Sequence, residues 1–118
     1  VPVKGRVRVC LEELQGYSLK GKTLLDIGSS FGWLMSTFTN KGLKQAVGID
    51  TDNHALAYAR KKLPNYKFIL TSSDKTTLKN NSVDFVTMFD VIEHVNKNEE
   101  LKTFKEVSRV LKKEGRLF

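Results

Sequence analysis

The chain has 118 residues, of which 40% are hydrophobic and 28% charged, which suits one small globular domain over residues 1–118 and excludes a disordered chain or a two-domain enzyme. Its 20 Lys and Arg against 13 Asp and Glu give a net charge of +7, compatible with a solvated lysine-rich surface or with an anionic partner such as nucleic acid. Its one cysteine, Cys10, and the lack of an apolar signal or membrane-spanning segment predict a cytoplasmic protein without a disulfide, metal site or membrane contact.

Along the chain, segments with the apolar spacing of a helix alternate with short apolar runs that are typical of strands. Val7, Leu11 and Leu14 predict an amphipathic helix over residues 6–16, which Gly16 can end. The other predicted strands and helices are, in order, a strand at 23–27, a helix at 31–40, a strand at 45–50, a helix capped by Thr51 or Asp52 and ending before Pro64, strands at 66–71 and 83–91, a helix at 97–113 that Gly115 ends, and a strand from 116 onwards. The helix at 97–113 is expected to bury a stripe made of Leu101, Phe104, Val107 and Leu111.

This alternation predicts an α/β fold with a doubly wound, mostly parallel sheet of about five strands and helices on both faces. In such a sheet, ligands bind outside the carboxyl ends of the strands. Six acidic residues follow the predicted strands, namely Asp26, Asp50, Asp52, Asp74, Asp90 and Glu93. Asp52 has an alternative explanation as a helix cap, whereas Asp26 and Asp50 directly end apolar runs, so we expect a shared ligand crevice at this edge.

The loop after the first strand reads Gly28-Ser29-Ser30-Phe31-Gly32. Glycines let backbone approach a ligand closely, and amides at the start of a helix favour an anion. Asp50, at the tip of the second strand, can accept both hydroxyls of a ribose. These features predict an adenosine-like ligand with an anionic or polar tail. The glycine spacing is one residue too short for the dinucleotide fingerprint, which tells against a nicotinamide cofactor.

Several motifs together resemble the class I S-adenosylmethionine-dependent methyltransferases. DIGSSFG (26–32) is similar to the first motif of that family, D-x-G-x-G-x-G, with Ser30 for the middle glycine. GID (48–50) supplies the acidic end of the second strand, and FDVIEHV (89–95) is similar to the fourth-strand motif. NNSVDFV (80–86) and RVLKKEGRLF (109–118) resemble the segments around them, so the resemblance spans roughly residues 20–118.

The resemblance implies S-adenosylmethionine as the cofactor and a role for each matching residue. The backbone of Gly28, Ser29, Ser30 and Gly32 would hold the methionine part, with Asp26 near its ammonium group. Asp50 would bind the ribose hydroxyls and Thr51 would lie beside the adenine. Asp74, or the backbone around Ser73, would contact the adenine amino group. Phe89 and Asp90 would border the sulfonium.

Two positions depart from the family pattern. Ser30 replaces a glycine, which a serine tolerates if its φ stays negative. Asp74 lies about two places from the position of the family's acid, which leaves its role open.

An acceptor that must lose a proton would need a base, and His94 is the candidate because imidazole titrates near neutral pH. The alternative is a histidine that caps or packs at the start of the next segment. Glu93 is expected to hold local structure or the cofactor end of the site. Trp33 is expected in the core rather than over the cofactor, and His54 at the surface.

The family's sheet usually continues with an antiparallel pair of strands, whereas this chain stops in its fifth strand. We expect a fragment of a longer chain, a homodimer that covers the exposed sheet edge, or a minimal binding domain.

Three classes of function follow. The first is a methyltransferase, or its cofactor-binding core, acting on an unidentified acceptor that we expect to be a small molecule. An RNA methyltransferase is a variant of it that the net charge favours. The second is a non-catalytic S-adenosylmethionine-binding or partner module, and the third is a nicotinamide oxidoreductase.

Overall fold

The computed structural model describes residues 12–89 and 97–118. The predicted site residues Asp90, Glu93 and His94 therefore lie outside the described residues, as does most of the predicted first helix. Residues 12–15 of that helix are helical, and the turn that follows begins at Gly16, as predicted. No helix in the described ranges is both long and apolar enough to cross a membrane.

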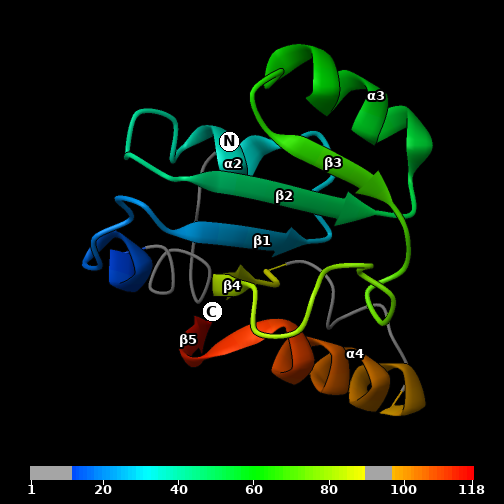
Figure 1. The fold of residues 1–118 in the computed structure, drawn as a ribbon. Coiled ribbons are helices and arrows are strands. Elements are labelled where there is room, and N and C mark those ends of the chain that lie inside the picture. Colours follow the sequence, from blue (N-terminus) through cyan, green and yellow to red (C-terminus); the bar gives the residue numbers. More distant parts are fainter. Residues whose placement is uncertain (1–11, 90–96) are drawn as a thin grey trace.

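Five parallel strands form one sheet in the order β3-β2-β1-β4-β5 (Figure 1). They are β1 (Thr23–Ile27), β2 (Gln45–Asp50), β3 (Lys67–Leu70), β4 (Val83–Thr87) and β5 (Leu111–Leu117). The chain builds outward from β1 through β2 to β3, then returns to the other side of β1 for β4. This reversal places the end of β1 at the topological switch point, where parallel sheets bind ligands. No described strand pairs with the outer edge of β5.

Helices cover both faces of the sheet, as the sequence predicts (Figure 1). Side chains of α2 (Trp33–Ser36) and α3 (Asn53–Lys62) pack with Leu24 on one face. Side chains of α4 (Lys97–Val110) pack with Leu25 and Ile27 on the other. Successive strand residues point to opposite faces, so β1 contributes to two cores and must be apolar almost throughout.

Several boundaries differ from the sequence prediction. Helix α2 has only four residues, and Asn40 in the following turn has a φ of +69°. Strand β4 ends at Thr87, before the predicted end at residue 91. The buried residues of α4 are Thr103, Glu106, Val107 and Val110, whereas Leu101, expected in the stripe, is 62% exposed.

The largest difference from the sequence prediction is at the C-terminal end of α4. The helix stops at Val110 and β5 begins at once with Leu111, which pairs with Val83 of β4. The pairing then jumps to Phe85 with Arg116, so the intervening residues of β5 form an irregular bulge. Gly115 does not end the helix. It lies inside β5, where a Cβ atom would come within 2.6 Å of the Leu111 side chain. Pairing with β4 overrides the helical pattern, since a strand partner is a tertiary contact that periodicity does not contain.

Candidate functional site

The loop after β1 bends over the end of β2. The backbone N–H groups of Gly28 and Ser29 both donate to the carbonyl oxygen of Ile49, at 2.9 Å each. The N–H of Ser30 donates to Oδ2 of Asp50 at 2.8 Å. The predicted glycine loop and the predicted ribose-binding acid are thus in direct contact, which brings two of the sequence motifs together at one edge of the sheet.

The backbone of this loop is left-handed at three positions. Gly28 and Gly32 have φ values of +75° and +83°, which glycine adopts without strain. Ser30 has a φ of +51°, so the condition of a negative φ, under which a serine replaces this glycine without strain, is not met. The hydrogen bond from its N–H to Asp50 holds Ser30 in this conformation, which a residue with a Cβ atom adopts at a cost.

Most N–H groups of the loop already have acceptors inside the protein. Besides those of Gly28, Ser29 and Ser30, the N–H of Gly32 donates to the carbonyl oxygen of Ser29 at 2.9 Å. With α2 reduced to one turn, the loop has little of the helix-terminal charge that the sequence suggested for an anion. The groups of this loop that could contact a ligand are therefore mainly its carbonyl oxygens and the surface that lacks Cβ atoms.

The Ser29 side chain points into the protein. Its hydroxyl is buried and has no hydrogen-bond partner among the described residues. A Cβ atom on Gly48 would come within 2.7 Å of this hydroxyl, so Gly48 makes room for the loop. Ser29 can meet a ligand only through its backbone.

Asp26 lies beneath the loop and is only 3% exposed. Its Oδ1 accepts a hydrogen bond from the hydroxyl of Thr87 in β4 at 2.7 Å. Thr87 is fully buried, and sequence reasoning missed it because it stands inside an otherwise apolar strand. The pair fixes a carboxylate at the switch point between β1 and β4.

Both carboxylate oxygens of Asp50 accept hydrogen bonds from backbone N–H groups. Its Oδ1 accepts from the N–H of Asp52 at 2.9 Å, in addition to the bond from Ser30 to Oδ2. Asp52 caps α3, as predicted, by accepting from the N–H of Ala55 at 3.1 Å. Thr51 is exposed beside them, and His54 is exposed on α3 as expected.

A long loop of residues 71–82 joins β3 to β4 and begins beside this site, since the N–H of Thr71 donates to the carbonyl oxygen of Asp50 at 3.1 Å. Ser73 and Asp74, the predicted adenine contacts, are half-buried in it. The Ser72 hydroxyl donates to Oδ1 of Asp74 at 2.7 Å, and this hydrogen bond is the main reason why the pKa of Asp74 lies below its usual value.

Both aromatic residues considered for the site from the sequence, Phe89 and Trp33, pack against the core. Phe89 is half-buried and packs against the core on the α2 and α3 face. Trp33 is half-buried in the same core, as expected. Sequence reasoning missed a third feature, the exposed pair of Phe31 and Tyr58, whose ring centres are 5.5 Å apart in an edge-to-face arrangement.

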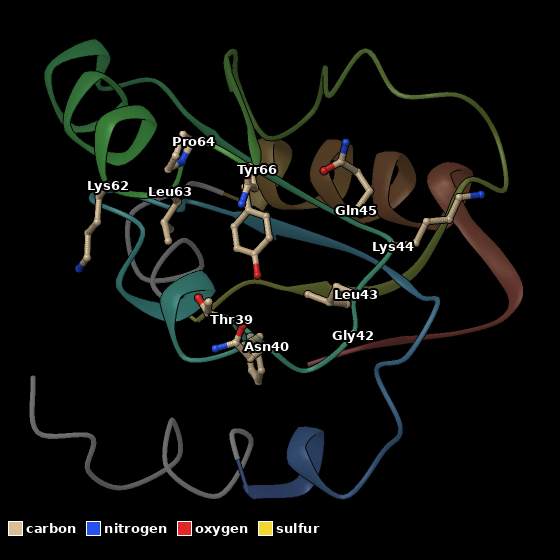
Figure 2. Close-up of a pocket in the computed structure, with 12 residues that line it drawn as sticks. Thr39, Asn40, Gly42, Leu43, Lys44, Gln45, Lys62, Leu63, Pro64 and Tyr66 are labelled. Carbon is tan, nitrogen blue, oxygen red and sulfur yellow. The ribbon is translucent and has the colours of Figure 1, made fainter.

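A pocket of about 420 Å³ lies elsewhere, at the amino ends of β2 and β3 (Figure 2). Tyr66 extends toward Leu43 and Asn40 in its centre, whereas the ammonium groups of Lys44 and Lys62 point outward. None of the predicted site residues lines it. Among the described residues, no group of three or more His, Cys, Asp or Glu could hold a metal ion.

A family model described as a methyltransferase domain matches residues 25–118. The chain belongs to the class I S-adenosylmethionine-dependent methyltransferase family. This methyltransferase domain is similar to the PH0226 protein from Pyrococcus horikoshii OT3, with a TM-score of 0.84 and 28% identity over 95% of this chain and 54% of that one.

Two curated relatives are enzymes named for different acceptors. The domain is 27% identical over 119 residues to the ubiquinone/menaquinone biosynthesis C-methyltransferase UbiE of Campylobacter jejuni, covering 96% of this chain and 50% of that protein. It is 42% identical over 52 residues to the ribosomal protein L11 methyltransferase of Mannheimia succiniciproducens, covering 44% of this chain and 18% of that protein. The methyltransferase domain thus spans half or less of the length of these relatives.

Proposed function

We propose that this domain binds S-adenosylmethionine at the carboxyl ends of β1, β2 and β3 and takes part in the transfer of its methyl group to an acceptor. The observation that carries the proposal is the contact between the Asp50 carboxylate and the N–H of Ser30, at 2.8 Å. It joins the glycine loop and the acidic strand end into one preorganised unit.

Asp50 has the capacity to bind a ribose while it holds the loop. A carboxylate offers about four lone-pair positions, and the N–H groups of Ser30 and Asp52 occupy one on each oxygen. The remaining positions suit the two hydroxyls of a ribose. The bonds from the backbone fix the orientation of the carboxylate before the ligand arrives, which lowers the entropy cost of binding.

The loop residues suit the methionine part. Carbonyl oxygens of the segment from Gly28 to Gly32 can accept from an ammonium group, and the buried carboxyl group of Asp26 below them offers further acceptor oxygens. The left-handed glycines let the ligand approach the backbone without meeting a Cβ atom. The residues present therefore fit the cofactor that the family uses.

Bound S-adenosylmethionine supplies an activated methyl group for in-line displacement by the acceptor. The residues of the chain itself would hold the cofactor and the acceptor in the orientation that the transfer requires. We assign Ser73, Asp74 and Thr51 to the adenine side, and Phe89 and Asp90 to the sulfonium side. His94 is the proposed base for an acceptor that must lose a proton, and an acceptor that is nucleophilic without proton loss would not require it.

The acceptor class is a separate proposal, for which we favour a small molecule. UbiE is named for quinone biosynthesis and the other relative for a ribosomal protein, so a first acceptor screen should contain a quinone precursor and a ribosomal protein. The net charge of +7 favours RNA as a second candidate. An affinity for RNA that falls steeply with salt would support it.

Calorimetric titration with S-adenosylhomocysteine, the product of methyl transfer, tests the proposal, with NAD as the control. Micromolar binding of the first and none of the second would support it. A folded chain that binds neither would contradict it. A chain that binds S-adenosylhomocysteine but methylates no acceptor in a broad pool would point to a non-catalytic binding module.

A further inference from the structure

Helix α4 holds the loop that follows β3 by two polar contacts one turn apart. The hydroxyls of Ser73 and Thr103 share a hydrogen bond of 2.6 Å. Oε2 of Glu106 accepts from both the N–H and the hydroxyl of Thr76, at 2.7 and 2.8 Å. Thr103 and Glu106 are three residues apart and lie on the same face of the helix. The segment between Ser73 and Thr76 is therefore attached at both of its ends.

The residues that attach the loop to α4 are buried, and this burial favours one position of the loop over others. Thr76, Thr103 and Glu106 are 0%, 1% and 8% exposed. A buried carboxylate is tolerated only when it is paired and hydrogen-bonded, and Arg109 completes the set with its Nε 2.6 Å from Oε1 of Glu106. Displacing the loop would leave that carboxylate without two of its donors, which disfavours other loop positions.

Hydrogen bonds within the loop also fix its conformation at the end that lies beside the site. The N–H of Lys75 donates to the carbonyl oxygen of Ser72 at 3.0 Å, and the hydroxyl of Thr71 donates to that of Lys75 at 2.6 Å. Thr71 itself is bonded to the carbonyl of Asp50. Ser73 and Asp74 are thus held in a closed turn, with Asp50 on one side and α4 on the other.

We propose that Glu106, together with Thr103, is a positioning residue for the adenine half of the cofactor. It touches no part of the ligand and acts by fixing the turn of Ser73 and Asp74 beside Asp50. This inference rests on the proposed function, because the adenine contact of that turn is part of it. Sequence reasoning had no signal for Glu106, which reads as an ordinary charged helix residue until the loop is placed against it.

The test compares binding of S-adenosylhomocysteine with that of S-inosylhomocysteine, in which an oxo group replaces the adenine amino group. Glu106→Gln removes the charge while keeping the shape, and Thr103→Val removes one hydroxyl. Thr103→Ser should restore what Thr103→Val loses. Glu114→Gln, at an exposed position of β5, is the control for loss of one negative charge. Circular dichroism confirms that each variant is folded at the temperature of titration.

We expect Glu106→Gln and Thr103→Val to weaken binding of S-adenosylhomocysteine about tenfold, because the correctly placed turn becomes a smaller fraction of the ensemble. They should also reduce the preference for adenosyl over inosyl, which a general loss of stability would not do. If Glu106→Gln does not fold, the affinity and the adenosyl preference of Thr103→Val test the inference. Folded variants with unchanged affinity and unchanged preference would overturn the inference alone. A wild-type chain that binds neither ligand would refute the proposed function and this inference with it.

Discussion

The N–H of Ser30 donates to the carboxylate of Asp50 across 20 positions of sequence, at 2.8 Å. The same carboxylate accepts from the N–H of Asp52, at the start of α3. One side chain thus connects the loop after β1 with the helix that follows β2. A substitution of Asp50 would disturb the shape of the candidate site as well as the proposed contact with a ribose.

Asp50→Ala should lower the affinity for S-adenosylhomocysteine by more than about 100-fold, because a hydrogen bond to a charged group is worth about 1.5–3 kcal/mol and two would be lost to the ribose. Titration calorimetry measures this. Asp52→Ala is the matched control, since it removes a helix cap worth about 1 kcal/mol of stability but no proposed ligand contact. Equal losses of affinity in the two variants would argue against a ribose contact by Asp50.

Ser30→Gly should raise the free energy of unfolding by up to about 1 kcal/mol, because glycine adopts the observed φ of +51° without the strain of a Cβ atom. Urea unfolding measures the change. The same substitution at Ser108, exposed within α4, should lower stability by about 0.5 kcal/mol because glycine is a poor helix former. A loss of stability in Ser30→Gly would show that the serine side chain contributes more than its backbone strain costs.

Gly48→Ala should destabilise the fold by about 1–3 kcal/mol, the usual cost of overpacking a core. The new Cβ atom would lie 2.7 Å from the hydroxyl of Ser29 and 2.8 Å from the ring of Phe68. Because the Ser29 contact lies beneath the glycine loop that we propose to hold the cofactor, affinity for S-adenosylhomocysteine should fall as well. Gly21→Ala is a useful comparison, since its φ of +72° is strained by a side chain but its Cβ atom would meet nothing within 4 Å. It should lower stability and leave affinity unchanged.

Glu106 should make stability depend on pH in the acid range. Its hydrogen bonds, first those from Arg109, lower its pKa from 4.5 to about 2. A lowered pKa in the folded state stabilises the protein above the unfolded value of 4.5, and this contribution is lost as the pH falls from 4.5 toward 2. The shift corresponds to about 3 kcal/mol.

Urea unfolding between pH 7 and pH 3 measures this contribution. The difference in stability between wild type and Glu106→Gln should shrink as the pH falls through that range. A difference that stays constant with pH would mean that the charge of Glu106 does not stabilise the fold.

The alternation of apolar runs predicted the sheet and the helices on both faces, because an element that buries one or both faces carries a periodic apolar pattern in its own sequence. The cap at Asp52 followed from local chemistry in the same way, since a cap bonds a residue three positions away.

Contacts between segments far apart in the chain could not be predicted from the sequence pattern. The early start of β5 depends on its pairing with β4, and the left-handed Ser30 depends on a carboxylate from another strand. The roles of Thr87 and Glu106 likewise appear only once β4 lies beside β1 and the loop of residues 71–82 lies against α4. Hydrophobic periodicity decided the layers of this protein, whereas polar contacts between segments far apart in sequence decided the detailed shape of its candidate site.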